Sequence, residues 1–374
     1  MLRVLISAGE TSGDMHAASV MHAASAYGEA VDWWGIAGPA MRAEGCLPVA
    51  TMEALNVMGV GDVLRAMPRI RHIERTLLAR CEEHRPDVAL LVDFPGFHMR
   101  LGCKLRAMGI PVLQYIAPKL WAWGAWRAGK LAQAQDALAS ILPFEETWFK
   151  ARGIDARYVG NPSVIACRVG WSPDALRARL GVAPDTPLLA LLPGSRAGEL
   201  RRHVPILAEV AQRLRSTNKE LHIVVPVAQG VAPKTLEPML GARTHLLPRD
   251  DAEFSLRGVS AAVAVSGTAT LELALWNVPT ILVYRAPWLM ALMARGVVRV
   301  PWVGLVNILL QRSVMPELLQ RDCCPERIVA EVARVLRHPQ AQYDAFAELR
   351  ALLGVRDPAP AVLRQLTLLA HKSA

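Results

Sequence analysis

The stretch AAVAVSGTATLE, residues 261–272, decides the fold of this chain. Its first five residues form a continuous apolar run typical of a buried parallel strand, and the residues after Gly267 begin a helix. The small-residue turn between them offers backbone N–H groups, hydroxyls and the positive end of a helix dipole to an anion. An ordinary helix start with a Ser or Thr cap is the alternative. The pattern predicts a nucleotide diphosphate site formed by Ser266, Gly267, Thr268 and Thr270, with Glu272 in reach of a ribose hydroxyl.

The same alternation of strand and helix patterns runs through the chain. Apolar runs typical of strands cover Leu2–Ser7, Val31–Ile36, Asp87–Val92, Val112–Ile116, Leu138–Leu142, Leu188–Leu192, Leu221–Val225, Ala261–Val265 and Thr280–Val283. Helical patterns lie between them, at Asp14–Tyr27, Val63–Glu83, Phe97–Met108, Ala197–Leu214 and Thr268–Leu275. Strands that are apolar throughout and separated by helices predict parallel sheets covered on both faces. The expected fold class is α/β, with two Rossmann-like doubly wound domains facing a cleft.

A chain of 374 residues is too long for one ordinary core, so we expect two domains. Gly and Pro interrupt the pattern between Gly160 and Pro173, which places the boundary there. The expected domains are residues 1–165 and 166–344. The tail is mostly helical, and its helices from about 345 to 374 are expected to pack back onto the first domain.

The composition limits the class of protein. With 52% hydrophobic and 20% charged residues, the chain is globular rather than disordered. Its net charge of +9 predicts an acidic partner, for which nucleic acid, anionic lipid and a phosphorylated substrate all qualify. The six cysteines lack the spacing of a zinc site. The start, Met1–Gly9, has the pattern of a strand rather than of a signal peptide, so we expect a cytoplasmic protein.

Two segments suit a membrane surface, although no run is long and uncharged enough to span a bilayer. In Ala286–Leu310, Arg and Trp stand beside Leu and Met, which fits a lipid interface or a buried core. The second segment combines Arg65, Arg69, Arg71 and Arg75 with Leu64, Met67, Ile70 and Leu77. A packed amphipathic helix is the alternative for this second segment.

Two polar segments directly follow strands of the first half. In SAGETSGD, Ser7–Asp14, the acidic groups argue against a pyrophosphate and favour a wall that hydrogen-bonds sugar hydroxyls, with a plain capped turn as the alternative. Its candidate ligand residues are Gly9, Glu10, Ser12 and Gly13. Asp93, directly after the strand Asp87–Val92, is well sited as a general base, and a helix cap is the rival.

Another polar segment, LPGSR at Leu192–Arg196, opens the second half. Arg196 can neutralise a diphosphate or a leaving group beside Gly194 and Ser195, and a helix cap with a solvent-facing Arg is the alternative. In Ala117–Arg127, three Trp residues lie among basic ones, which suits sugar stacking or a lipid interface. Core packing of two of the three Trp residues is the alternative.

These motifs together resemble one family, the lipid A disaccharide synthases. The similar segments are SAGETSGD at Ser7–Asp14, GIAGPAMRAEG at Gly35–Gly45, LNVMGVGDVL at Leu55–Leu64, LPGSR at Leu192–Arg196, SGTATLELAL at Ser266–Leu275 and PELLQ at Pro316–Gln320. The resemblance implies an inverting glycosyltransferase with the two-domain GT-B fold. Its reaction would join UDP-2,3-diacylglucosamine to 2,3-diacylglucosamine 1-phosphate and give a β-1′,6-linked disaccharide 1-phosphate and UDP. No metal or other cofactor is implied.

The resemblance also implies roles for individual residues. Asp93 matches the base that acts on the 6-hydroxyl of the acceptor, and Arg196 matches a second catalytic residue, which stabilises the departing UDP. The turn Ser266–Glu272 matches the segment that holds UDP. Asn307 matches a third catalytic residue, and would otherwise be a satisfied turn residue. The first domain would face the acceptor and the membrane, and the second would bind the UDP-sugar. The implied location is the cytoplasmic side of the anionic inner membrane, without nucleic acid, and a homodimer is left open.

The chain departs from the family pattern where we expect the acceptor. Gly96 and His98 replace an Asp and an Asn after Asp93, so His98 is a second candidate for the proton transfer. The other departures are Ala117–Lys119, Asn161 and Pro301–Val303. The alternative functions are a GT-B transferase or epimerase acting on a soluble UDP-N-acetylhexosamine, and a basic protein that binds nucleotides or nucleic acid.

Overall fold

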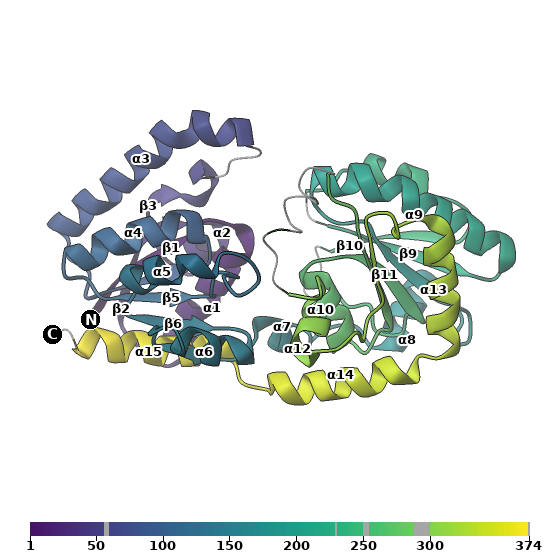
Figure 1. Cartoon of the computed structure of the whole chain (residues 1–374). Coiled ribbons are helices and arrows are strands. Elements are labelled where there is room, and N and C mark those ends of the chain that lie inside the picture. Colours follow the sequence, from purple (N-terminus) through teal and green to yellow (C-terminus); the bar gives the residue numbers. More distant parts are fainter. Residues whose placement is uncertain (56–59, 229, 250–253, 288–295, 297–299, 373–374) are drawn as a thin grey trace. The chain divides into compact units, whose positions relative to one another are not determined.

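The computed structural model describes residues 1–55, 60–228, 230–249, 254–287, 296 and 300–372 (Figure 1). The chain forms two compact units. Unit 1 contains Met1–Pro162 together with Arg356–Ala374, and unit 2 contains Ser163–Val355. Each unit has its own parallel sheet with helices on both faces, so the expected α/β class with two domains is confirmed.

Unit 1 is built on a parallel sheet of seven strands in the order β3-β2-β1-β4-β5-β6-β7. The strands are β1 (Leu2–Ala8), β2 (Val31–Ala37), β3 (Leu47–Thr51), β4 (Val88–Val92), β5 (Val112–Tyr115), β6 (Ala137–Ser140) and β7 (Ala156–Tyr158). β1 and β4 are fully apolar except at their ends because each packs against helices on both sides.

Helices cover the two faces of this sheet. They are α1 (Thr11–Ala26), α2 (Pro39–Ala43), α3 (Val60–Glu83), α4 (Pro95–Ala107), α5 (Ala128–Ala134), α6 (Pro143–Lys150) and α15 (Pro358–Lys372), with short 3-10 helices at Met52–Leu55 and Ala125–Arg127. α1 and α15 pack on one face in a core with Val4, Ile6 and Leu90. α3 and α4 pack on the other face with Leu5 and Leu91, and Figure 1 shows α15 on the opposite side of the sheet from α3.

Unit 2 repeats this plan with a parallel sheet of six strands in the order β10-β9-β8-β11-β12-β13. The strands are β8 (Leu188–Leu192), β9 (His222–Val227), β10 (Thr244–Pro248), β11 (Ala261–Val265), β12 (Thr280–Tyr284) and β13 (Glu317–Leu319). The helices are α7 (Pro162–Ala166), α8 (Pro173–Leu180), α9 (Ala197–Thr217), α10 (Thr268–Leu275), α12 (Leu305–Leu310), α13 (Pro325–Arg337) and α14 (Gln340–Leu353), with a 3-10 helix at Pro233–Met239. α9 and α13 pack on one face, and α8 and α10 on the other.

The C-terminal tail is shared between the two units. The sequence predicted instead that all helices from about residue 345 onward pack on the first domain. α14 belongs to unit 2, where the Gln342 side chain accepts a hydrogen bond from the N–H of Thr280 and donates one to its carbonyl. α15 alone belongs to unit 1, because its apolar face packs against α1. The boundary between the units within the tail therefore lies after Val355.

In each sheet the strand order reverses between two central neighbours. These are β1 and β4 in unit 1, and β8 and β11 in unit 2. In open parallel sheets, ligands bind outside the carboxyl ends of the strands at such a reversal. Among the residues that the structure describes, no helix is long and apolar enough to cross a membrane.

Candidate active site

Asp93 directly follows β4, so it lies at the carboxyl edge of unit 1 where the strand order reverses. Its backbone and that of Phe94 are both left-handed, with φ of 51° and 49°. Such backbone costs on the order of 1–2 kcal/mol for an L residue and persists where the surrounding structure enforces it. Burial, and to a smaller extent the charge of Glu10, raises the pKa of the Asp93 carboxyl. A hydrogen bond from the Phe94 backbone and then the charge of Lys119 oppose the rise. A half-buried carboxylate with a raised pKa suits a general base.

The SAGETSGD segment follows the neighbouring strand β1 and divides into exposed and structural residues. Glu10, at the N-cap of α1, and Ser12 are exposed. Gly9 is required by packing, because a Cβ there would lie 2.3 Å from the Phe94 ring. Gly13 is buried, and a Cβ there would make ordinary contacts of 3.4 Å or more with Val92 and Ala8. Of the four expected sugar ligands, only Glu10 and Ser12 present side chains to solvent.

Asp14, in the same segment, caps another helix. Its buried carboxylate accepts hydrogen bonds from the N–H groups of Gly38, Ala40 and Met41, at the start of α2. Through this contact the Asp of SAGETSGD holds the helix start within GIAGPAMRAEG.

His98 is fully buried in the first turn of α4. Its Nδ1 lies 2.6 Å from the Asp93 carbonyl oxygen, and its Nε2 lies 2.9 Å from the Ser7 hydroxyl oxygen. Both ring nitrogens are thus engaged inside unit 1, and burial lowers the pKa of His98 to about 4. The expectation that His98 shares the proton transfer is therefore corrected: the ring reaches the Asp93 backbone and not the solvent.

The tryptophan loop after β5 is anchored by one residue and exposed at two others. The Trp121 indole donates to the buried Glu145 carboxyl at 3.0 Å, and burial raises the pKa of Glu145 to about 7. Trp123 and Trp126 are exposed, and the Arg127 guanidinium lies over the Trp123 ring. Only Trp121 of these three residues is packed in the core, whereas the alternative reading of the sequence expected two.

In unit 2, the turn predicted to hold a diphosphate joins β11 to α10. Gly267 is the N-cap of α10, and both it and Thr268 are exposed, so the first N–H groups of this helix point to the carboxyl edge of the sheet. Thr270 is different, because its fully buried hydroxyl donates to the Gly267 carbonyl at 2.8 Å. We correct its expected role from ligand to support of the turn.

Glu272 lies on the same helix and is paired with a residue that the sequence analysis missed. The Arg249 guanidinium, directly after β10, donates to Glu272 Oε2 at 2.8 Å and stacks over Phe254. Nothing in the sequence pairs two residues that are 23 positions apart, so only the fold identifies Arg249.

The LPGSR loop follows β8, the neighbour of β11. Two of its backbone N–H groups, which could have bound a phosphate, instead donate to the Glu199 side chain. Glu199 Oε2 accepts from the backbone N–H of Ser195 at 3.2 Å and of Arg196 at 3.3 Å. Gly194 is required, since a Cβ there would lie 2.6 Å from that oxygen. The Arg196 side chain is 80% exposed and lies 3.6 Å from Glu199. A Glu three residues after a helix cap is a capping signal, and the sequence carries it as Glu199 after Arg196.

Asn307 is fully buried and makes all of its hydrogen bonds inside unit 2. Its Nδ2 donates to the Met315 carbonyl and to Glu317 Oε1, both at 2.8 Å. Its Oδ1 accepts from the N–H groups of Val314 and Met315. The amide has no capacity left for a substrate, so the expected catalytic role is corrected to that of a satisfied turn residue.

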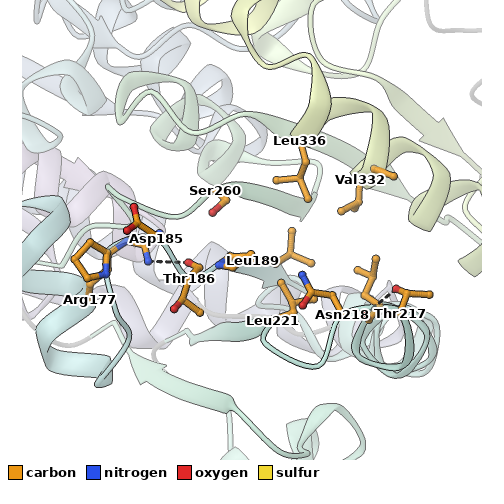
Figure 2. A pocket seen from close by; sticks show the side chains of 14 residues that line it. Arg177, Asp185, Thr186, Leu189, Thr217, Asn218, Leu221, Ser260, Val332 and Leu336 are labelled. Atoms are coloured by element: carbon orange, nitrogen blue, oxygen red, sulfur yellow. Dashed lines mark hydrogen bonds between the residues drawn. The ribbon is translucent and has the colours of Figure 1, made fainter.

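A cavity of about 410 Å³ lies at the opposite edge of the unit 2 sheet (Figure 2). Leu189, Leu221 and Ser260, which line it, stand at the amino ends of β8, β9 and β11. Arg177 in its wall donates to the Thr186 carbonyl. Since this edge is remote from the turns after β8 and β11, the cavity is not part of the candidate site.

The family model for lipid-A-disaccharide synthetase matches residues 4–355. The chain belongs to the lipid-A-disaccharide synthetase family. Its relatives agree with this family: the lipid-A-disaccharide synthase of Anaeromyxobacter dehalogenans is 41% identical, over 94% of this chain and 93% of that protein. The synthase of Myxococcus xanthus is 39% identical over the same shares. The resemblance seen in the sequence is confirmed, and the chain is a glycosyltransferase of lipid A disaccharide synthesis that uses a sugar nucleotide and an acceptor.

Solved structures share the fold of this lipid-A-disaccharide synthetase family member at low identity. The calicheamicin glycosyltransferase CalG4 has a TM-score of 0.64 at 15% identity and covers 100% of this chain and 99% of its own. The UDP-GlcNAc 2-epimerase of Neisseria meningitidis, bound to UDP-GlcNAc, has a TM-score of 0.66 at 12% identity and covers 98% and 100%. These likenesses show the fold alone, so the family match favours lipid A synthesis over the epimerase alternative.

Two sequence expectations lie partly outside the described residues. In the segment Ala286–Leu310, residues 288–295 and 297–299 are not described. The same holds for residues 56–59 of LNVMGVGDVL and for the side chains of Leu64 and Arg65.

Proposed function

We propose that this enzyme transfers 2,3-diacylglucosamine from its UDP donor to the 6-hydroxyl of 2,3-diacylglucosamine 1-phosphate, with inversion. The family and the polar residues at the two sheet edges support this proposal. The products are the β-1′,6-linked disaccharide 1-phosphate and UDP. The single observation that carries the mechanism is Asp93, a half-buried carboxylate with a raised pKa at the strand reversal of unit 1.

In the proposed reaction the 6-oxygen of the acceptor attacks the anomeric carbon as the bond from that carbon to the UDP oxygen breaks. Asp93 takes the hydroxyl proton, and its raised pKa makes the carboxylate a stronger acceptor than an ordinary aspartate. Exposed Glu10 and Ser12 stand at the end of the neighbouring strand, where they would hydrogen-bond the acceptor sugar.

Unit 2 would hold the donor. The open start of α10, with Ser266, Gly267 and Thr268, presents N–H groups and hydroxyls to the diphosphate. Exposed Arg196 would neutralise charge on the departing UDP, and Glu272, fixed by Arg249, would face the ribose. Gly194 and Ser195 would act through the loop that carries Arg196, because Glu199 occupies the Ser195 N–H.

We also propose that the enzyme binds to the anionic cytoplasmic face of the inner membrane and reacts there with its acylated substrates. Arg69, Arg71 and Arg75 are exposed along α3. The apolar residues of that helix turn inward: Leu77 is fully buried and Ile70 packs on the core. The lipid attraction of α3 would therefore be electrostatic.

The decisive experiment supplies purified enzyme with both substrates in detergent micelles and measures disaccharide and UDP. We expect product from the wild type, and a loss in kcat of about 10²–10⁴-fold in Asp93→Asn with the affinity for UDP unchanged. Asp136→Asn is the matched control, since this carboxylate bonds Arg106 and the N–H of Val112 at the amino end of β5.

Absence of disaccharide from the wild type would refute the proposed substrates. Full activity of Asp93→Asn would remove Asp93 from the mechanism. Conversion of a soluble UDP-N-acetylhexosamine without a lipid acceptor would revive the epimerase alternative.

A further inference from the structure

His98 is a buried titratable group that the proposed mechanism does not use. A carbonyl oxygen only accepts hydrogen bonds, so the contact with the Asp93 carbonyl requires the proton of His98 on Nδ1. Burial keeps the ring neutral at pH 7, which leaves Nε2 as an acceptor. The Ser7 hydroxyl therefore donates to Nε2 and fixes this tautomer.

The Asp93 peptide is held by neighbours from three other elements. The Gln114 side chain of β5 also donates to the Asp93 carbonyl, at 3.2 Å, and the Asp93 N–H donates to the Tyr115 carbonyl at 2.8 Å. His98 reaches the same carbonyl from α4 and connects it to Ser7 on β1. These contacts hold a left-handed backbone that an Asp-Phe pair does not adopt by itself.

We propose that His98 is a positioning residue that aims the Asp93 carboxylate, by holding the Asp93 carbonyl in the left-handed turn after β4. The inference rests on the proposed role of Asp93 as the base. The resemblance described in the sequence analysis implies an Asn at this position, where this chain has His98. An imidazole has nitrogens on opposite sides of its ring, and so it spans from Asp93 to Ser7, whereas an Asn side chain is shorter.

The turn also sets the distances from Asp93 to the charged groups that face it. These are Glu10 at the start of α1 and Lys119 in the loop after β5. Burial and Glu10 place the pKa of Asp93 above its ordinary value. A relaxed turn would let water reach the carboxylate, so its pKa would fall and the acid limb of the rate profile would move to lower pH.

The test compares His98→Leu, which fills the space without a hydrogen bond, with His98→Asn, which keeps a donor. We expect kcat of His98→Leu to fall by about 10²-fold, because a small misplacement of a catalytic group has an effect of this order. KM for the UDP donor should stay within about twofold, since the donor is held by unit 2. His98→Asn should recover part of kcat, and both acid limbs should shift to lower pH.

His84→Leu is the matched control. His84 Nε2 bonds the Asp32 carboxylate at 2.8 Å, at the amino end of the same sheet. Its loss should lower stability and leave kcat and the acid limb unchanged. If His98→Leu keeps the wild-type kcat and acid limb while Asp93→Asn is inactive, the positioning role of His98 is overturned and the role of Asp93 as the base stands.

An active Asp93→Asn variant would overturn the base assignment, and the positioning role with it. Where His98→Leu does not fold, His98→Asn decides the question. A reduced kcat with a shifted acid limb supports the proposal, and an unaltered profile overturns it.

Discussion

Asn307 illustrates how a motif residue can support a turn instead of touching substrate. Replacing it with Ala would leave the N–H groups of Val314 and Met315 and the carboxylate of Glu317 without this partner. Each buried group that loses its partner costs about 1–3 kcal/mol. We expect Asn307→Ala to lower the melting temperature by on the order of 10 °C, measured by thermal unfolding followed by circular dichroism.

Asn218→Ala is the control for this prediction, because the exposed Asn218 side chain accepts a local hydrogen bond from the N–H of Glu220, and the loss of this exposed bond should be nearly neutral. A normal melting temperature in Asn307→Ala combined with a large loss of kcat would restore the catalytic role.

At the scale of single residues, the sequence predicted where polar groups gather but not what they bond. Asp93, Glu10 and Gly267 stand at the expected strand ends. Thr270 has the same chemistry as Thr268 and lies two positions away, yet its hydroxyl bonds the Gly267 carbonyl while Thr268 is exposed. Helix geometry turns residues two apart to different faces, and only the packing of α10 decides which of the two is buried.

At the scale of elements, the start of α10 is the clearest candidate for the diphosphate. Gly267 has extended backbone, and a Cβ added there would meet no atom within 4 Å. Gly267→Ala should therefore leave the melting temperature unchanged. If phosphate oxygens approach this backbone closely, the added methyl group will lower the affinity for UDP by about tenfold or more, measured by calorimetry.

Gly230→Ala would be a poor control because its φ of 80° disfavours Ala. Gly129→Ala in α5, also with open space around its Cβ, is the matched one. Unchanged UDP affinity in Gly267→Ala would move the diphosphate away from this turn.

The helix α15 offers a matched pair of substitutions. Leu366 is fully buried against unit 1, whereas Leu368 on the same helix is 58% exposed. We expect Leu366→Asp to destabilise unit 1 by several kcal/mol, because an uncompensated charge enters the core. Leu368→Asp should change stability by less than about 0.5 kcal/mol. Urea unfolding of the two variants measures the difference, and equal effects would contradict the packing of α15.

The strands that the sequence analysis missed are the outer ones. Apolar runs predicted the central strands of both sheets, but β3, β7, β10 and β13, the two edges of each sheet, gave no such signal. β7 and β13 have three residues each, and β3 is largely exposed. An edge strand has a neighbour on one side only and is often short, so its sequence carries little hydrophobic pattern. The central strands, which position the site, are the ones with the strongest signal.

At the scale of the whole molecule, the net charge of +9 can be tested against the proposed membrane surface. We expect the enzyme to sediment with vesicles that contain anionic lipid, and less so in 0.5 M salt, a concentration at which screening acts within roughly 4–5 Å. Replacing Arg69, Arg71 and Arg75 together with Gln should weaken binding by about 1 kcal/mol for each arginine near the surface.

The control removes the same charge elsewhere, from Arg327, Arg334 and Arg337 on α13 of unit 2. If the two triple variants weaken vesicle binding equally, the net charge of the protein alone explains its attraction to anionic lipid, and α3 is not the binding surface.

The chain passes from one unit to the other twice, after Pro162 and after Val355. Unit 2 is one continuous stretch, whereas unit 1 needs Val362, Leu363 and Leu366 of α15 to cover one face of its sheet. On the ribosome, the residues of unit 2 are therefore all synthesised before those of unit 1 are complete. Until α15 is made, α1 covers only part of this face, so nascent unit 1 exposes apolar surface while the whole of unit 2 is translated. Such exposed surface is prone to aggregation and is what chaperones bind.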